Sequence, residues 1–180
     1  MLGDGCRSPT ENRVMDVETL ERQIGIQLPD DYRCHLSAAT TFQLDATHWY
    51  RITERTPFGD KGGIDRLLTL KDFAKEGING FPDVKMLIIG DNLFGYTTCI
   101  CLDRARYGHV FYYDFEQRSL WAREQFFKMF PDLSEDIKQY IQDRDLGLLP
   151  KKQDGFESFY HTANSFSGFI AKLERENTDD

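Results

Sequence analysis

The sequence lacks the features that mark membrane, secreted and nucleic-acid-binding proteins. No apolar run among its 180 residues approaches the ~20 that a membrane-spanning helix requires. The first 13 residues, MLGDGCRSPTENR, contain no apolar segment of the kind found in secretory signals. Lysine and arginine number only 22 against 30 aspartate and glutamate residues, which gives a net charge of -8. Because binding of phosphate groups calls for a basic surface, we expect a cytoplasmic protein that binds neither membrane nor nucleic acid.

Residues that ligate metals or act as nucleophiles are few and form no known motif. The histidines lack the HExxH and HxxxH spacings of zinc sites, and the four cysteines form no CxxC pair. Cys99 and Cys101 lie two apart on one strand face, where disulfide geometry is poor, so we expect reduced thiols. We therefore predict no metal, no cofactor and no catalytic residue. An alternative stays open, in which Cys34 or Cys99 meets His109 in the folded chain as nucleophile and base.

The densest apolar stretch, residues 86–114, predicts the core of the fold. Met86 to Ile89, Phe94 to Leu102 and His109 to Tyr113 are rich in β-branched and aromatic residues and are separated by turn residues. Neither face of the middle segment carries a charge, which is typical of a central strand that is covered on both sides. We therefore expect three consecutive antiparallel strands. Gly90-Asp91-Asn92 is interpreted as a plain turn and not as a phosphate loop, because the GxGxxG and Walker spacings are absent.

Helical patterns precede these strands. Asp16 stands at the N-cap and Gly25 at the C′ position of an amphipathic helix. Pro29 and the two aspartates after it open a second helix that we expect to run to about Ala39. Between this helix and the core strands we predict a strand at Trp49 to Thr53, a flexible turn at Gly59 to Gly63, a short strand at Ile64 to Leu68 and a helix opened by a Thr69–Asp72 capping box.

Helical patterns also follow the core strands. Residues 120–130 form an aromatic-rich helical pattern, and Ser134 caps a second helix. The aromatic residues would either pack against the sheet or form a stripe for a partner, and we expect the first. A closing helix is predicted over residues 163–173, where apolar residues recur at helical spacing. The aromatic residues concerned are Trp121, Phe126, Phe127 and Phe130.

Carboxylates concentrate around the helix that Ser134 caps. Only Lys138 and Arg144 balance them, so the cluster would attract and orient a basic protein. The alternative is a solvated helix face, whose first-turn carboxylates interact favourably with the helix dipole, and excess negative charge also serves solubility alone. The predicted partner-binding residues are Asp132, Glu135, Asp136, Asp143 and Asp145.

Four segments resemble the SUKH superfamily, in the order in which its members have them. LERQIGIQLPDDYRCHL is similar to the N-terminal signature, a helix ending in Gly followed by Leu-Pro, an acidic residue, an aromatic residue and a leucine. Family members usually continue into an Asn-Gly-Gly turn, where this chain has Ala39-Thr40-Thr41. LIIGDNLFGYTTCICLD resembles the family's strand, glycine turn and strand, GHVFYYDFE resembles its next strand, and ANSFSGFIAKL resembles its closing helix.

The patterns and the resemblance together predict an α+β fold. We expect a mainly antiparallel central sheet flanked by N-terminal and C-terminal helices. A single SUKH-like domain would span residues 14–176, between a flexible leader at 1–13 and a solvated tail at 177–180. Residues from about 117 to 150 depart from the compact family pattern and form a helical insertion before the last helix.

The resemblance implies a binding module and not an enzyme. In bacteria, SUKH proteins are associated with immunity to toxins, often nucleases, that neighbouring cells deliver, and elsewhere they serve as scaffolds in signalling or cell-wall regulation. The first hypothesis is an immunity protein that binds and neutralises a cognate, basic toxin domain in the cytoplasm. The second is a regulatory or scaffold module without a toxin partner, and the third, more distant, is an enzyme with a Cys/His site.

Overall fold

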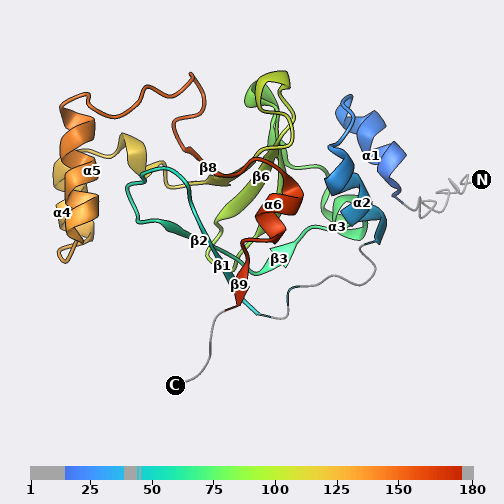
Figure 1. The fold of residues 1–180 in the computed structure, drawn as a ribbon, viewed down its shortest axis with the longest axis horizontal. Coiled ribbons are helices and arrows are strands. Elements are labelled where there is room, and N and C mark those ends of the chain that lie inside the picture. The colour runs from blue at the N-terminus through green and yellow to red at the C-terminus, as the bar shows by residue number, and fades with distance from the viewer. Residues whose placement is uncertain (1–14, 39–43, 45, 176–180) are drawn as a thin grey trace, which may run out of the picture.

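A computed structural model describes residues 15–38, 44 and 46–175 (Figure 1). The leader expected at 1–13, Cys6 and the tail expected at 177–180 lie outside the described residues. The helices are α1 (Val17–Ile24), α2 (Asp30–Ala38), α3 (Leu70–Glu76), α4 (Arg123–Met129), α5 (Glu135–Asp145) and α6 (Phe166–Ile170), with short 3-10 helices at η1 (Pro82–Val84), η2 (Arg104–Arg106) and η3 (Arg118–Leu120). The strands are β1 (His48–Arg51), β2 (Lys61–Ile64), β3 (Arg66–Leu67), β4 (Gly80–Phe81), β5 (Met86–Asp91), β6 (Thr97–Cys101), β7 (Val110–Tyr113), β8 (Phe159–Ala163) and β9 (Glu174–Arg175).

Two antiparallel sheets form the centre of the fold. The larger has the order β3-β5-β6-β7-β8, with β4 also paired to β5, and the smaller has the order β2-β1-β9. In the larger sheet β6 is the middle strand, and its Ile100 lies opposite Leu87 on one side and Val110 on the other. The predicted α+β fold, with an antiparallel sheet and flanking helices, is therefore confirmed.

The two faces of β6 belong to two separate apolar clusters, as the alternation of its side chains predicts. Ile100 and Leu102 pack with residues of α1, α2, α3, α6 and the smaller sheet, which cover one face. Cys99 and Cys101 point to the opposite face, where Phe111, Phe156 and other side chains cover them. Because both faces are buried, a charged side chain at either would have no access to water.

Local signals in the sequence set the ends of the first helices. The Asp16 carboxylate accepts the backbone N–H of Thr19 at 2.7 Å, and Gly25 ends α1 with a φ of 71°. A left-handed residue of this kind favours glycine, which has no Cβ to clash. Thr69 and Asp72 form both hydrogen bonds of the expected capping box at α3. These predictions are confirmed, and α2 is described as far as Ala38, with Ala39 outside the described residues.

Two glycine segments that were predicted as turns prove to be strand. Gly62 and Gly63 lie in β2, and a Cβ at Gly62 would come within 2.7 Å of the Tyr50 ring. The glycines therefore allow two strands to approach each other closely, and they do not form a turn. Gly90 and Asp91 likewise belong to β5, so the turn of the β5–β6 hairpin begins two residues later than predicted, at Asn92.

The closing helix is much shorter than predicted. Residues 159–163 form β8, the edge strand of the larger sheet, and α6 begins only after Ser165, whose hydroxyl accepts the N–H of Gly168 at 3.0 Å. Ala163 shares the helical spacing of the apolar residues after it, but it ends the strand. The buried side chains of α6 are Phe166 and Phe169, which pack onto the same face of the sheet as Ile100.

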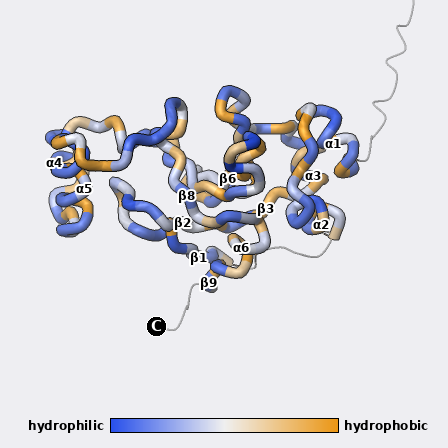
Figure 2. Tube along the Cα trace, turned by 45° about the horizontal axis from the view of Figure 1, so that its top comes forward, coloured by the Kyte–Doolittle hydropathy of each residue, from blue (hydrophilic) through white to orange (hydrophobic). Residues whose placement is uncertain are grey.

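The helices α4 and α5 lie at the opposite end of the molecule from α1, α2 and α3 (Figure 1). Their apolar residues form a cluster of their own, in which Phe126 packs with Tyr140 and Ile141. The expected packing of the inserted aromatic residues against the sheet is therefore wrong, because the one of them that is fully buried, Phe126, packs between α4 and α5. Phe127 and Phe130 remain partly exposed, and both helices alternate between hydrophobic and hydrophilic stretches along their length (Figure 2). In the part of the chain that the structure describes, no helix is long and apolar enough to cross a membrane.

Candidate partner-binding site

The five carboxylates predicted to bind a partner all lie on or beside α5. Ser134 occupies the N-cap position, although its side chain makes no capping hydrogen bond, and Glu135 and Asp136 lie in the first turn. Asp132 lies just before the helix, and Asp143 lies near its end, with Asp145 as the last residue. The cluster therefore extends along the whole helix, a rise of about 1.5 Å per residue.

The structure divides these carboxylates into two groups. Asp143 accepts a hydrogen bond from Arg55 at 2.6 Å and another from Gln139 at 2.7 Å. The Arg55 hydrogen bond is the main reason why the pKa of Asp143 lies below its usual value. Asp145 pairs with Arg144 at 2.7 Å, so both carboxylates at the end of α5 are already bound within the chain.

The carboxylates at the start of α5 face solvent. Glu135 is exposed and pairs with Lys138, one helical turn away, at 2.6 Å. Asp132 and Asp136 are exposed, and neither forms an ion pair with another described residue. An incoming basic group would find these three carboxylates accessible, whereas it would have to displace an arginine to reach Asp143.

Arginine side chains fix α5 to the rest of the fold. Arg144 donates to the backbone carbonyls of Ser119 and Trp121 at 3.2 and 2.7 Å, which joins the end of α5 to the segment that leads into α4. Arg55, from the segment after β1, reaches Asp143 across 88 positions of sequence. The acidic start of α5 is thus presented on an anchored element, which lowers the conformational cost of binding.

A cleft of about 840 Å³ lies between β8 and the segment that follows α5. Most of its cationic side chains are already engaged. Arg55 pairs with Asp143, Arg144 with Asp145, and Lys152 with Glu54. The charged residues and histidines of its lining are Arg55, Arg106, Arg144, Lys151, Lys152, His109, His161, Glu54 and Glu157.

The sequence patterns did not predict this cleft, because its lining comes from segments far apart in the chain. Thr53, His109 and His161 meet there, and the ring centroids of the two histidines lie 5.2 Å apart. In the sequence, the adjacent lysines at 151 and 152 are a local sign of basic character. No periodicity within a single helix or strand could reveal such a site.

The alternative of a Cys/His site requires a thiol that ionises. Burial raises the pKa of the Cys99 thiol, which lies at 0% exposure in an apolar cluster. A raised pKa disfavours the thiolate that would act as nucleophile. His109 instead packs beside His161, and Cys34 is exposed on α2. Among the described residues no group of three or more His, Cys, Asp or Glu is placed to hold a metal ion.

The comparison with known proteins agrees with the resemblance of the four sequence segments. No curated protein and no solved structure matches the chain. The SMI1 / KNR4 family (SUKH-1) matches residues 14–172, which include every helix from α1 to α6 and every strand from β1 to β8. The chain therefore belongs to the SMI1 / KNR4 family (SUKH-1).

Proposed function

We propose that this protein is a cytoplasmic immunity protein that binds a cognate toxin domain and neutralises it without catalysis. The observation that carries the proposal is the family match over residues 14–172. The net charge of -8 supports a basic toxin domain as partner, because complementary charge speeds encounter and selects orientation.

The acidic face of α5 is the proposed docking surface for this partner. Asp132, Glu135 and Asp136 would make the contacts, since they are exposed at the start of the helix. Asp143 and Asp145 contribute to the local potential but act mainly by fixing the helix through Arg55 and Arg144. Neutralisation would then follow from steric cover of the toxin's active site or substrate surface, with no bond made or broken.

The test is co-expression with the toxin domain encoded by an adjacent gene, scored by growth of the host. We expect this chain to restore growth, and a purified complex to form with a toxin domain that carries an inactivating substitution. A variant with Cys34, Cys99 or His109 replaced should rescue equally once its stability is matched, because no catalysis is involved. Failure of the folded wild-type chain to bind or rescue would favour the regulatory or scaffold module of the same family.

A further inference from the structure

The tip of the β5–β6 hairpin exposes two large apolar side chains. Leu93 is 92% exposed and Phe94 is 77% exposed, more than any other large hydrophobic residue that the structure describes. The two residues are consecutive, so the tip of the hairpin carries two exposed large apolar side chains. Exposed apolar patches of this kind on soluble proteins commonly mark sites of interaction.

The turn itself does not require these two side chains. The Asn92 side-chain carbonyl accepts the backbone N–H groups of Phe94 and Tyr96 at 2.9 and 3.0 Å. Gly95 donates its N–H to the Asn92 carbonyl at 3.0 Å and has a φ of 82°, which favours glycine. Asn92 and Gly95 thus supply the turn chemistry, and polar residues at positions 93 and 94 would close the hairpin equally well.

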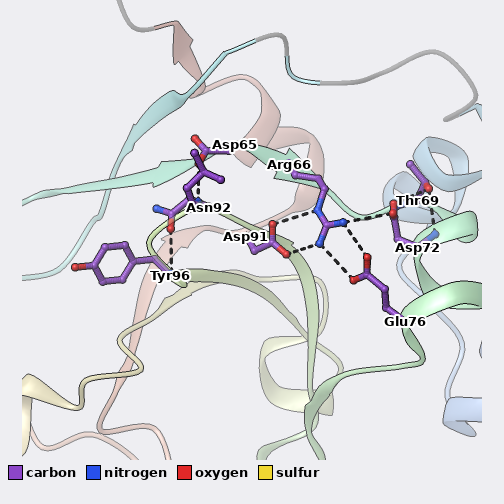
Figure 3. A network of polar contacts seen from close by, with 9 residues as sticks. Asp65, Arg66, Thr69, Asp72, Glu76, Asp91, Asn92 and Tyr96 are labelled. Atoms are coloured by element: carbon purple, nitrogen blue, oxygen red, sulfur yellow. Dashed lines mark hydrogen bonds and ion pairs between the residues drawn. The ribbon is translucent and has the colours of Figure 1, made fainter.

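Polar contacts with the preceding strands hold the tip in one position (Figure 3). The backbone N–H of Leu93 donates to the Asp65 carboxylate at 2.7 Å, and the Asn92 side chain donates to the Gly63 carbonyl at 3.3 Å. At the base of the tip, Arg66 binds Asp91 through two hydrogen bonds of 3.2 and 2.7 Å. A backbone that is held before binding loses little conformational entropy when a partner covers the tip.

The surroundings of the tip indicate the chemistry of that partner. Phe115 is half-exposed and its ring lies 5.6 Å from that of Tyr96, which adds a further apolar surface beside the hairpin. Arg66 is shared among three carboxylates, and the Asp65 carboxylate adds a fourth next to Leu93. These carboxylates are Asp65, Asp72, Asp91 and Glu76. The complementary surface is an apolar pocket with basic side chains at its rim.

We propose that Leu93 and Phe94 are an apolar anchor that inserts into an apolar, basic-rimmed pocket of the toxin domain. This inference rests on the proposed function and adds a second contact to the acidic start of α5. A central apolar anchor commonly carries a large share of binding energy, whereas peripheral charge mainly sets the rate of encounter. The hairpin would therefore govern the lifetime of the complex.

The test measures binding of the inactivated toxin domain to a Leu93→Ser/Phe94→Ser variant. We expect the dissociation constant to rise about 30-fold or more, mainly through faster dissociation, as for a hot spot. The matched control is Leu120→Ser/Leu148→Ser, which removes two apolar side chains of 65% and 67% exposure elsewhere. This control should bind like the wild type, and urea denaturation should show that both variants remain folded.

The outcomes separate this inference from the proposed function. If the wild-type chain binds and the hairpin variant binds equally well, the anchor is overturned while the immunity function stands. If the wild-type chain does not bind the toxin domain at all, both proposals are overturned. If the wild type sediments as a dimer and the hairpin variant as a monomer, a second copy of this chain covers Leu93 and Phe94. The proposal that the toxin domain binds these side chains is then wrong.

Discussion

Glu54 and Lys152 form an ion pair of 3.1 Å that covers the outer edge of β8. The Glu54 carboxylate accepts the backbone N–H of His161, and the Lys152 ammonium donates to the carbonyl of Phe159 at 2.6 Å. These are backbone groups that a further strand would otherwise bind. The two side chains thus bind the His161 N–H and the Phe159 carbonyl at the edge of the larger sheet. These two backbone groups are therefore not available to pair with a strand from another chain.

Loss of this ion pair should destabilise the fold at the edge of the sheet. Lys152→Met keeps the apolar stem but leaves the Phe159 carbonyl without its donor and Glu54 without its counter-ion, so we expect a loss of about 1–3 kcal/mol in the free energy of unfolding. Glu54→Gln should cost less, because an amide oxygen can still accept the His161 N–H. Urea denaturation of both single variants and the double variant gives their coupling, expected at about 0.5–3 kcal/mol. Simple additivity would show that the two side chains act independently.

Elements with local signals could be predicted from the sequence. Asp16, Gly25 and the Thr69–Asp72 box act on backbone groups within a few residues, so their patterns are visible in a short window. The charge-free faces of residues 96–102 likewise predicted a central strand, because burial on both sides constrains every residue in it. The order of the three core strands followed from the turns between them.

Features that depend on distant residues could not be predicted. Gly62 lies in β2, where the ring of the cross-strand residue Tyr50 leaves no room for a Cβ, whereas the glycine alone is typical of a turn. The edge strand β8 lies just before α6, and the apolar spacing of α6 continues into the end of the strand. The pattern therefore predicted a helix where the strand ends. At the candidate site the sequence placed the carboxylates on one helix, but it could not show that Arg55 neutralises Asp143 from 88 positions away.

Truncation of a side chain at the centre of the sheet should be costly. Ile100 lies at 0% exposure in the middle strand, so Ile100→Ala would leave a cavity where Leu87 and Val110 now pack. We expect a loss of about 2–5 kcal/mol in the free energy of unfolding. Leu148→Ala, at an exposed position after α5, is the control and should change it by less than about 0.5 kcal/mol. A similar, small effect of both substitutions would contradict the central burial of Ile100.

Stability should fall as the pH drops through the ordinary pKa of histidine. Burial lowers the pKa of His109 and His161 from 6.5, with Arg106 also acting on His109 and His109 on His161. The unfolded chain therefore binds protons first, so stability is full above pH 6.5 and declines as the pH falls toward the folded-state values.

His109→Gln/His161→Gln should flatten this decline when urea denaturation is repeated between about pH 7 and pH 5, where histidine titrates. Aspartates with a lowered pKa, such as Asp72, change the stability only as the pH falls toward and below their ordinary pKa of 3.8. They therefore do not contribute to the change in stability between about pH 7 and pH 5. An equally steep decline in the variant would assign the effect to other groups, of which His35, whose pKa burial also lowers, is the first to examine.

The two ends of α5 should respond differently to neutralisation. Asp143→Asn would remove the charge that holds Arg55 at 2.6 Å, so we expect α5 to be anchored less firmly and the fold to become less stable. Asp136→Asn removes an exposed charge without a described partner, and such changes usually stay within about 0.5 kcal/mol. A stability measurement on these two variants separates the structural carboxylate from the one available for binding.

Exposed carboxylates at the start of α5 should speed the encounter with a basic toxin domain. We expect Asp132→Asn/Asp136→Asn to lower the association rate by about 2- to 10-fold at low salt, because charge complementarity steers approach more than it strengthens the final contact. The Debye length is ~10 Å at 0.1 M salt and shrinks as salt rises, so the effect should largely vanish at high ionic strength. Stopped-flow association at two salt concentrations measures this change in rate.

The control is Asp83→Asn/Asp154→Asn, which removes the same charge from exposed positions on other segments. It should leave the association rate much closer to that of the wild type. Equal slowing by both pairs would mean that net charge alone attracts the partner, and the α5 face would then have no special part in docking.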